Sequence, residues 1–77
     1  MKKVYIRFCK VWASYRPRAV RAAASIKKEL GIETELIEGK RGEFTVWVDD
    51  KIVAEKGWIR FPSDEKVVES VKQALSV

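Results

Sequence analysis

The side chain with the most distinctive chemistry in this sequence is that of Cys9, the only cysteine among 77 residues. It follows Val4, Ile6 and Phe8, whose alternation with polar residues predicts a strand. A helical pattern begins a few residues later, near Pro17, which a helix tolerates only in its first turn. A thiolate is a nucleophile toward disulfides and is readily oxidised. The sequence therefore predicts a candidate redox thiol between a strand and a helix.

Most other chemistries lack the residues they need. The chain has no histidine, and one cysteine permits neither an intramolecular disulfide nor an ordinary zinc site. It has no glycine-rich phosphate loop and no Ser/His/Asp set. We therefore expect no metal and no cofactor. The absence of a second thiol argues against dithiol oxidoreductase activity.

The net charge of +5 is concentrated in the first third of the chain. Residues 1–28 contain nine Lys and Arg residues and no acidic residue. Lys10, Arg16 and Arg18 fall near Cys9 and would favour its thiolate form. These cations would also attract a phosphate, a glutathione carboxylate or a nucleic-acid backbone, and they serve solubility equally well. The apolar runs are too short to span a bilayer and no signal peptide opens the chain, so we expect a cytoplasmic protein without membrane contact.

Apolar periodicity and turn residues predict a single α+β domain over residues 1–77, in the order strand, helix, strand, strand, strand, helix. The strands are expected at residues 3–8, 32–37, 43–48 and 51–55. Ser14 and Ser63 are the expected N-caps of the two helices, and Gly31 should end the first one in the left-handed conformation. The helix between the first two strands makes them parallel, and Asp49-Asp50 forms a hairpin turn.

Two helices do not easily cover both faces of a four-stranded mixed sheet, so we expect both on one face. The other face is then open and carries Tyr5, Arg7, Thr45 and Trp47. Aromatic rings beside a cation resemble a stacking platform for single-stranded nucleic acid, although no motif of a nucleic-acid-binding family is present. An exposed aromatic face is equally typical of a homodimer interface. Both interpretations stay open.

Aromatic residues also flank the thiol. Trp12 lies in the loop after Cys9, and Trp58 and Phe61 lie in the loop over residues 57–62. We expect the two loops to meet at one end of the sheet and to line a groove for a peptide or a small ligand. The alternative is that Trp12 fills the space beside Cys9, and that the thiol is a small buried hydrophobe, as free cysteines often are.

In their order and spacing, several motifs resemble the selenoprotein W/T/H-like (Rdx) family of small thioredoxin-like proteins. The resemblance covers nearly the whole chain. The hairpin is similar to the family's Gly-x-Phe-x-Val-x-Val-x-Gly pattern, in the residues Gly42-Glu-Phe-Thr-Val-Trp-Val-Asp-Asp-Lys51, followed by Lys56-Gly57 and Phe61-Pro62. Phe8-Cys9 resembles the aromatic-Cys pair that opens the family's redox loop. The segment that leads into the family's helix, Tyr-Lys-Pro-Lys-Ala, is similar to Tyr15-Arg16-Pro17-Arg18-Ala19.

The departure from the family concerns its redox centre, which is Cys-x-x-Cys or Cys-x-x-selenocysteine. If Cys9 is the first member, the second falls on Trp12. If the start of the helix sets the register, the pair falls on Lys10 and Ala13. Neither register supplies a second thiol.

The resemblance therefore implies a thioredoxin-like fold with a degenerate motif and a cell-redox role. That role is a monothiol or partner-binding function through Cys9, with glutathione or a thiol protein as the partner. The residues implied in binding are Lys10, Trp12, Arg16, Arg18, Trp58 and Phe61. The alternative is a non-enzymatic module that binds an anionic partner, RNA included, through the basic first third and the open face with Tyr5, Arg7 and Trp47.

Overall fold

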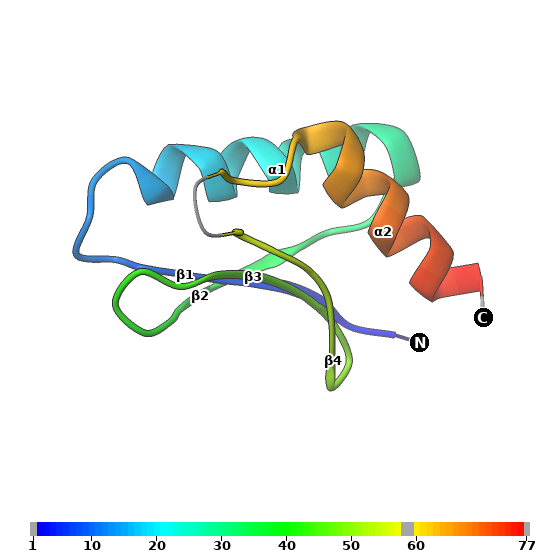
Figure 1. The fold of residues 1–77 in the computed structure, drawn as a ribbon. Coiled ribbons are helices and arrows are strands. Elements are labelled where there is room, and N and C mark those ends of the chain that lie inside the picture. The colour runs from blue at the N-terminus through cyan, green and yellow to red at the C-terminus, as the bar shows by residue number, and fades with distance from the viewer. Residues whose placement is uncertain (1, 58–59, 77) are drawn as a thin grey trace.

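The computed structural model describes residues 2–57 and 60–76 (Figure 1). Its elements follow the predicted order of strand, helix, three strands and helix. The strands are β1 (Val4–Phe8), β2 (Glu35–Glu38), β3 (Phe44–Val48) and β4 (Lys51–Glu55), and the helices are α1 (Tyr15–Leu30) and α2 (Asp64–Ser76). The strands form one mixed sheet in the order β2-β1-β3-β4. As predicted, β1 and β2 are parallel, while β3 is antiparallel to both β1 and β4.

Both helices lie on one face of the sheet, as the sequence predicts (Figure 1). The alanine stripe of α1 is buried at Ala19 and Ala22, which lets this helix approach the sheet closely, and Ile26 continues the stripe. Val67 and Val71 of α2 are fully buried in the same layer. One apolar core therefore lies between two helices and one face of four strands.

The alternation of β1 and β3 decides which side chains enter that core. Alternate residues of both strands are buried and face the helices: Val4, Ile6, Phe8, Phe44, Val46 and Val48. Ile6 lies directly opposite Val46 in the antiparallel pair. The residues that alternate with these buried ones point to the open face. There Tyr5 lies opposite Trp47 and Arg7 opposite Thr45. The predicted faces of both strands are confirmed.

Two predictions at element boundaries are wrong. β2 begins at Glu35 and not at Ile32, because its parallel pairing with β1 starts only at the Tyr5–Glu35 pair. Ser14 does not cap α1 through its side chain, since its backbone is already helical, with φ −70° and ψ −17°, whereas a capping residue is extended.

The predicted helix ends at Ser63 and Gly31 are confirmed. The Ser63 hydroxyl accepts the backbone N–H of Lys66 at 3.1 Å, and Asp64 and Glu65 fill the first turn of α2. Gly31 ends α1 with φ +69°, and its N–H donates to the carbonyl of Lys27 at 2.9 Å.

The predicted hairpin turn connects β3 to β4, and its left-handed residue is Asp49, with φ +58°. Aspartate is one of the few side chains that tolerate this conformation. The Asp49 carboxylate accepts the backbone N–H of Lys3 at 2.9 Å, and its own N–H donates to the carbonyl of Lys3 at 2.8 Å. The turn is therefore fixed to the start of β1, which holds the β1–β3 register.

Candidate functional site

Cys9 lies at the end of β1, inside the core. Its N–H donates to the carbonyl of Glu43 at 2.8 Å, which extends the β1–β3 pairing by one residue. The preceding Phe8 accepts the N–H of Gly39 through its carbonyl at 2.8 Å. Only 1% of the Cys9 surface is exposed. The thiol is thus covered, and both ends of the segment from Gly39 to Glu43 are bonded to the chain beside it.

The surroundings of the sulfur favour the thiolate. Burial raises the pKa of the Cys9 thiol, but hydrogen bonds from the backbone N–H groups of Gly42, Trp12 and Val11 outweigh this effect. The positive charge of Arg41 acts in the same direction, so the pKa lies below its ordinary value. These groups come from two loops, the one after β1 and the one after β2.

The second of these loops is a closed turn over residues 40–43. The N–H of Glu43 donates to the carbonyl of Lys40 at 3.0 Å, and Gly42 occupies the third position with φ +76°. A type II turn requires such a left-handed residue there, and glycine adopts it without strain. The Trp12 ring lies against this glycine, since a Cβ at position 42 would be 3.5 Å from the ring. The two loops around the thiol are therefore in contact.

Aromatic rings continue from Trp12 across the end of the sheet. Edge-to-face contacts join Trp12 to Tyr15 at 5.5 Å between ring centroids, Tyr15 to Phe61 at 4.8 Å, and Phe61 to Phe44 at 5.2 Å. Beside them is a groove of about 410 Å³, lined by Trp12, Tyr15, Gly42, Glu43, Phe44, Thr45, Glu55, Lys56 and Gly57. Of the residues expected to line a groove, Trp12 lines this one, whereas Phe61 packs against Tyr15 and Phe44. Trp58, which we also expected there, lies outside the described residues.

None of the predicted basic residues is among the groups that lower the pKa of the thiol. The Arg18 guanidinium lies 4.4 Å from the centre of the Phe61 ring, a cation–π contact, while Lys10 and Arg16 are exposed. The cation that lowers the pKa of the thiol is instead Arg41, from the loop after β2. The sequence reasoning missed Arg41 and Gly42 because they are more than 30 residues from Cys9 in the chain.

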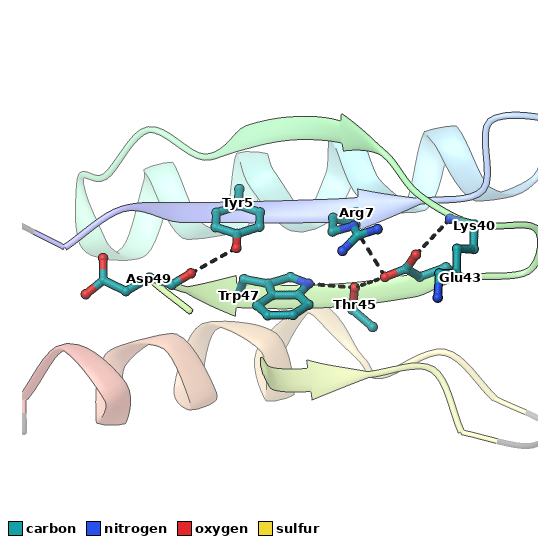
Figure 2. Close-up of polar contacts among 7 residues, drawn as sticks. All are labelled: Tyr5, Arg7, Lys40, Glu43, Thr45, Trp47 and Asp49. Carbon is teal, nitrogen blue, oxygen red and sulfur yellow. Dashed lines mark hydrogen bonds and ion pairs between the residues drawn. The ribbon is translucent and has the colours of Figure 1, made fainter. Parts of the chain in front are cut away.

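The open face is a connected polar and aromatic network (Figure 2). Tyr5 and Trp47 stack with ring centroids 5.7 Å apart and planes 8° apart. The Trp47 indole N–H donates to the Thr45 hydroxyl at 2.8 Å, which donates to Glu43 Oε2 at 2.7 Å. Arg7 lies 5.8 Å from the Trp47 ring centre and 3.6 Å, Nε to Oε2, from Glu43. The predicted residues Tyr5, Arg7 and Trp47 therefore do lie together, with polar atoms that already have partners within the protein.

Glu43 is a further functional candidate that the sequence prediction missed. Burial raises the pKa of its carboxyl, but hydrogen bonds from the Lys40 backbone and the Thr45 hydroxyl, together with the charges of Arg7 and Lys40, lower it below its ordinary value. In the sequence Glu43 reads only as the first residue of the strand predicted over residues 43–48. The usable signal is that Glu43, Thr45 and Trp47 share one face at strand spacing, where their polar groups meet.

The comparison with known families decides the chain's relationship. The sequence model of the Rdx family matches residues 3–73. The chain belongs to the Rdx family. This confirms the resemblance, the thioredoxin-like α+β fold and the membership of a redox-related, selenoprotein W-like family. A search of curated proteins found no match.

Residues 2–57 and 60–76 of this Rdx chain contain neither a metal-ligand cluster nor a membrane-spanning helix. Within these residues, no group of three or more His, Cys, Asp or Glu side chains is placed to hold a metal ion. Neither helix there is long and apolar enough to cross a membrane.

Proposed function

We propose that this Rdx protein is a single-thiol redox protein in which Cys9 forms a mixed disulfide with a partner. The observation that carries the proposal is the set of donors around the sulfur. Three backbone N–H groups and the charge of Arg41 lower the pKa of the thiol, and these groups stabilise an anion rather than a neutral S–H. A cysteine that served only as a small core hydrophobe would need none of them.

The proposed reaction is thiol–disulfide exchange. The Cys9 thiolate attacks one sulfur of a disulfide, such as glutathione disulfide, and a new S–S bond forms as the old one breaks. The second sulfur leaves as a thiolate and takes a proton from water. The chain holds one cysteine, so a thiol from outside must attack the mixed disulfide to release Cys9 reduced.

Access to the sulfur passes through the loop after β1. Cys9 itself is buried, whereas Val11 and Trp12 expose 69% and 45% of their surfaces. Trp12 and Gly42 contribute N–H groups toward the sulfur and also line the groove. A ligand seated in the groove therefore touches two residues whose N–H groups bond to the sulfur, and the buried thiol reacts with it after a shift of the Trp12 loop.

The test is labelling of the native protein with iodoacetamide and with glutathione disulfide. Every adduct reports on Cys9, because it is the only thiol. We expect alkylation at neutral pH with a pH midpoint below that of free cysteine, a glutathione adduct by mass spectrometry, and faster labelling in Trp12→Ala. Cys9→Ser is the blank. Labelling that requires denaturant would overturn the proposal.

A second proposed function is binding of an anionic partner, single-stranded RNA in particular, on the open face. It is favoured by the parallel Tyr5–Trp47 pair with Arg7 beside it on the face that no helix covers. Titration with oligonucleotides at increasing salt should show affinity that falls with salt and is lost in the Arg7→Ala, Trp47→Ala double variant. Absence of binding at low salt, or the same affinity in the double variant, rules this function out.

A further inference from the structure

We infer that Glu43 is a positioning residue for Cys9. Its carboxylate holds the turn over residues 40–43 in the conformation that brings Arg41 and Gly42 to the sulfur. The inference rests on the proposed function, because it concerns how the thiol is prepared for reaction. Glu43 itself is no catalytic residue, and its side chain lies on the open face.

The backbone of Glu43 ties the turn to the thiol segment. Its carbonyl accepts the N–H of Cys9 at 2.8 Å, and its N–H closes the turn on the carbonyl of Lys40 at 3.0 Å. The side chain closes the same turn a second time, since Oε1 accepts the N–H of Lys40 at 2.7 Å. Arg41 and Gly42 lie between these two bonded ends, and the Glu43 bonds therefore limit their conformations.

The carboxylate is in turn fixed by the sheet (Figure 2). Oε2 accepts the Thr45 hydroxyl at 2.7 Å and lies 3.6 Å from Nε of Arg7. Thr45 is only 8% exposed and the Glu43 side chain 14%, so these interactions are shielded from water. The turn is thus attached to β1 and β3 through side chains as well as through the backbone.

Gly39 supplies the space that this arrangement needs. A Cβ at position 39 would lie 2.6 Å from Glu43 Oε1 and 3.3 Å from the Cβ of Arg7. No side chain fits there while the carboxylate keeps its place. The Gly39 N–H meanwhile donates to the carbonyl of Phe8, one residue before the thiol.

Two effects of the Glu43 carboxylate on the thiol have opposite signs. Its negative charge alone disfavours a neighbouring thiolate, so removing the charge would favour ionisation of Cys9. Its positioning role favours the thiolate, so releasing the turn would oppose ionisation. The direction of the change in a Glu43 variant therefore separates positioning from simple electrostatics.

The test is a pH titration of thiolate absorbance in the ultraviolet, with the Cys9→Ser protein subtracted. This measurement needs no reagent to reach the sulfur. In Glu43→Gln we expect the midpoint to move to higher pH and the thiolate fraction below the midpoint to fall about threefold to tenfold, equivalent to the loss of one net hydrogen bond. The matched control is Glu38→Gln, the same change of charge at an exposed position before the same loop, and its midpoint should not rise.

Variants that keep the charge make the test independent of the folding of Glu43→Gln. Gly39→Ala displaces the carboxylate and Thr45→Val deletes its hydroxyl donor, so both should shift the midpoint upward. Thr45→Ser keeps a hydroxyl, so its titration midpoint should equal that of the parent protein. A midpoint that is unchanged or lower in variants with native circular dichroism overturns the inference.

The two proposals fail in different ways. If the native protein labels at Cys9 but the Glu43, Gly39 and Thr45 variants leave the titration midpoint in place, only the positioning role is lost. If Cys9 labels only in denaturant while the midpoint follows these variants, the exchange function is lost and the positioning of the thiol stands.

Discussion

The thiol and the open face both adjoin the turn over residues 40–43, but each interacts with a different part of this turn. On the open face, the carboxylate of Glu43 bonds to side chains, chiefly Thr45 and Arg7. At the thiol, the turn contributes a backbone N–H of Gly42 and the charge of Arg41. A single substitution removes a side-chain hydrogen bond, whereas the position of a backbone N–H donor changes only when the backbone conformation changes. Variants of the first kind therefore change the stability of the network and reach the thiol only through the turn, whereas variants of the second kind act on the thiol directly.

The largest loss of stability is expected when the network loses its central carboxylate. Glu43→Gln should lower the free energy of unfolding by about 1.5–3 kcal/mol, the range for a hydrogen bond to a charged group in a shielded place. Urea denaturation measures it. The exposed Glu38→Gln variant should stay within about 0.5 kcal/mol of the parent protein. Equal losses in both variants would mean that the network contributes no more than a surface charge.

The same carboxylate should make stability depend on acid. The pKa of Glu43 is lower in the folded protein than its ordinary value of 4.5, so its contribution is complete above that value. It is lost as the pH falls through the folded pKa, because the unfolded chain then binds the proton more readily. The difference in stability between the parent and Glu43→Gln should therefore shrink on acidification. If the difference in urea midpoint between the two proteins stays constant on acidification, Glu43 does not have a lowered pKa in the folded protein.

Alanine variants of the two left-handed glycines should distinguish a general loss of stability from a specific effect on the Cys9 thiol. Gly42 has φ +76° and Gly31 has φ +69°, so alanine at either position should cost about 1–2 kcal/mol. Gly31 lies at the far end of α1, and a Cβ there meets no atom within 4 Å. Only Gly42→Ala should raise the titration midpoint of Cys9. A rise in both variants would mean that the thiol reports general loosening of the fold.

The smallest effect is expected at the hairpin end of the open face. Tyr5→Phe removes the hydroxyl that donates to the Asp49 carbonyl at 2.9 Å but keeps the ring against Trp47. A loss of about 0.5–1 kcal/mol by urea denaturation is expected for one such bond, with no change in the Cys9 titration. A shifted titration would show that the whole face, and not only the turn after β2, sets the state of the thiol.

Most of the fold could be predicted from the sequence because its signals are local. The alternation in β1 and β3, the alanine stripe of α1 and the left-handed Gly31 each follow from a few neighbouring residues. Ser14 failed as a cap because its side chain alone does not reveal its backbone angles. The start of β2 depends on where its pairing with β1 begins, which is information from another strand.

The site could be predicted only in part, because its chemistry comes from the backbone and from distant residues. Cys9 and Trp12 are visible as residue types in a short segment. The N–H of Gly42 has no signature in a sequence, and Arg41 is one of 16 basic residues that spacing does not single out. Glu43 was predicted only as the first residue of a strand. Its spacing shows that it shares a face with Thr45, but Arg7, which also approaches its carboxylate, belongs to another strand.

The narrow space above Gly39 has a consequence for how this protein can vary. The missing side chain at position 39 and the carboxylate at position 43 occupy one volume, so the two positions are not independent. Gly39→Ala should cost more beside Glu43 than after residue 43 is shortened to alanine, when only the 3.3 Å contact with the Arg7 Cβ remains, and a double-mutant cycle measures this coupling directly. The order of substitution therefore matters, because a side chain at position 39 is tolerated better after the carboxylate at position 43 has been removed.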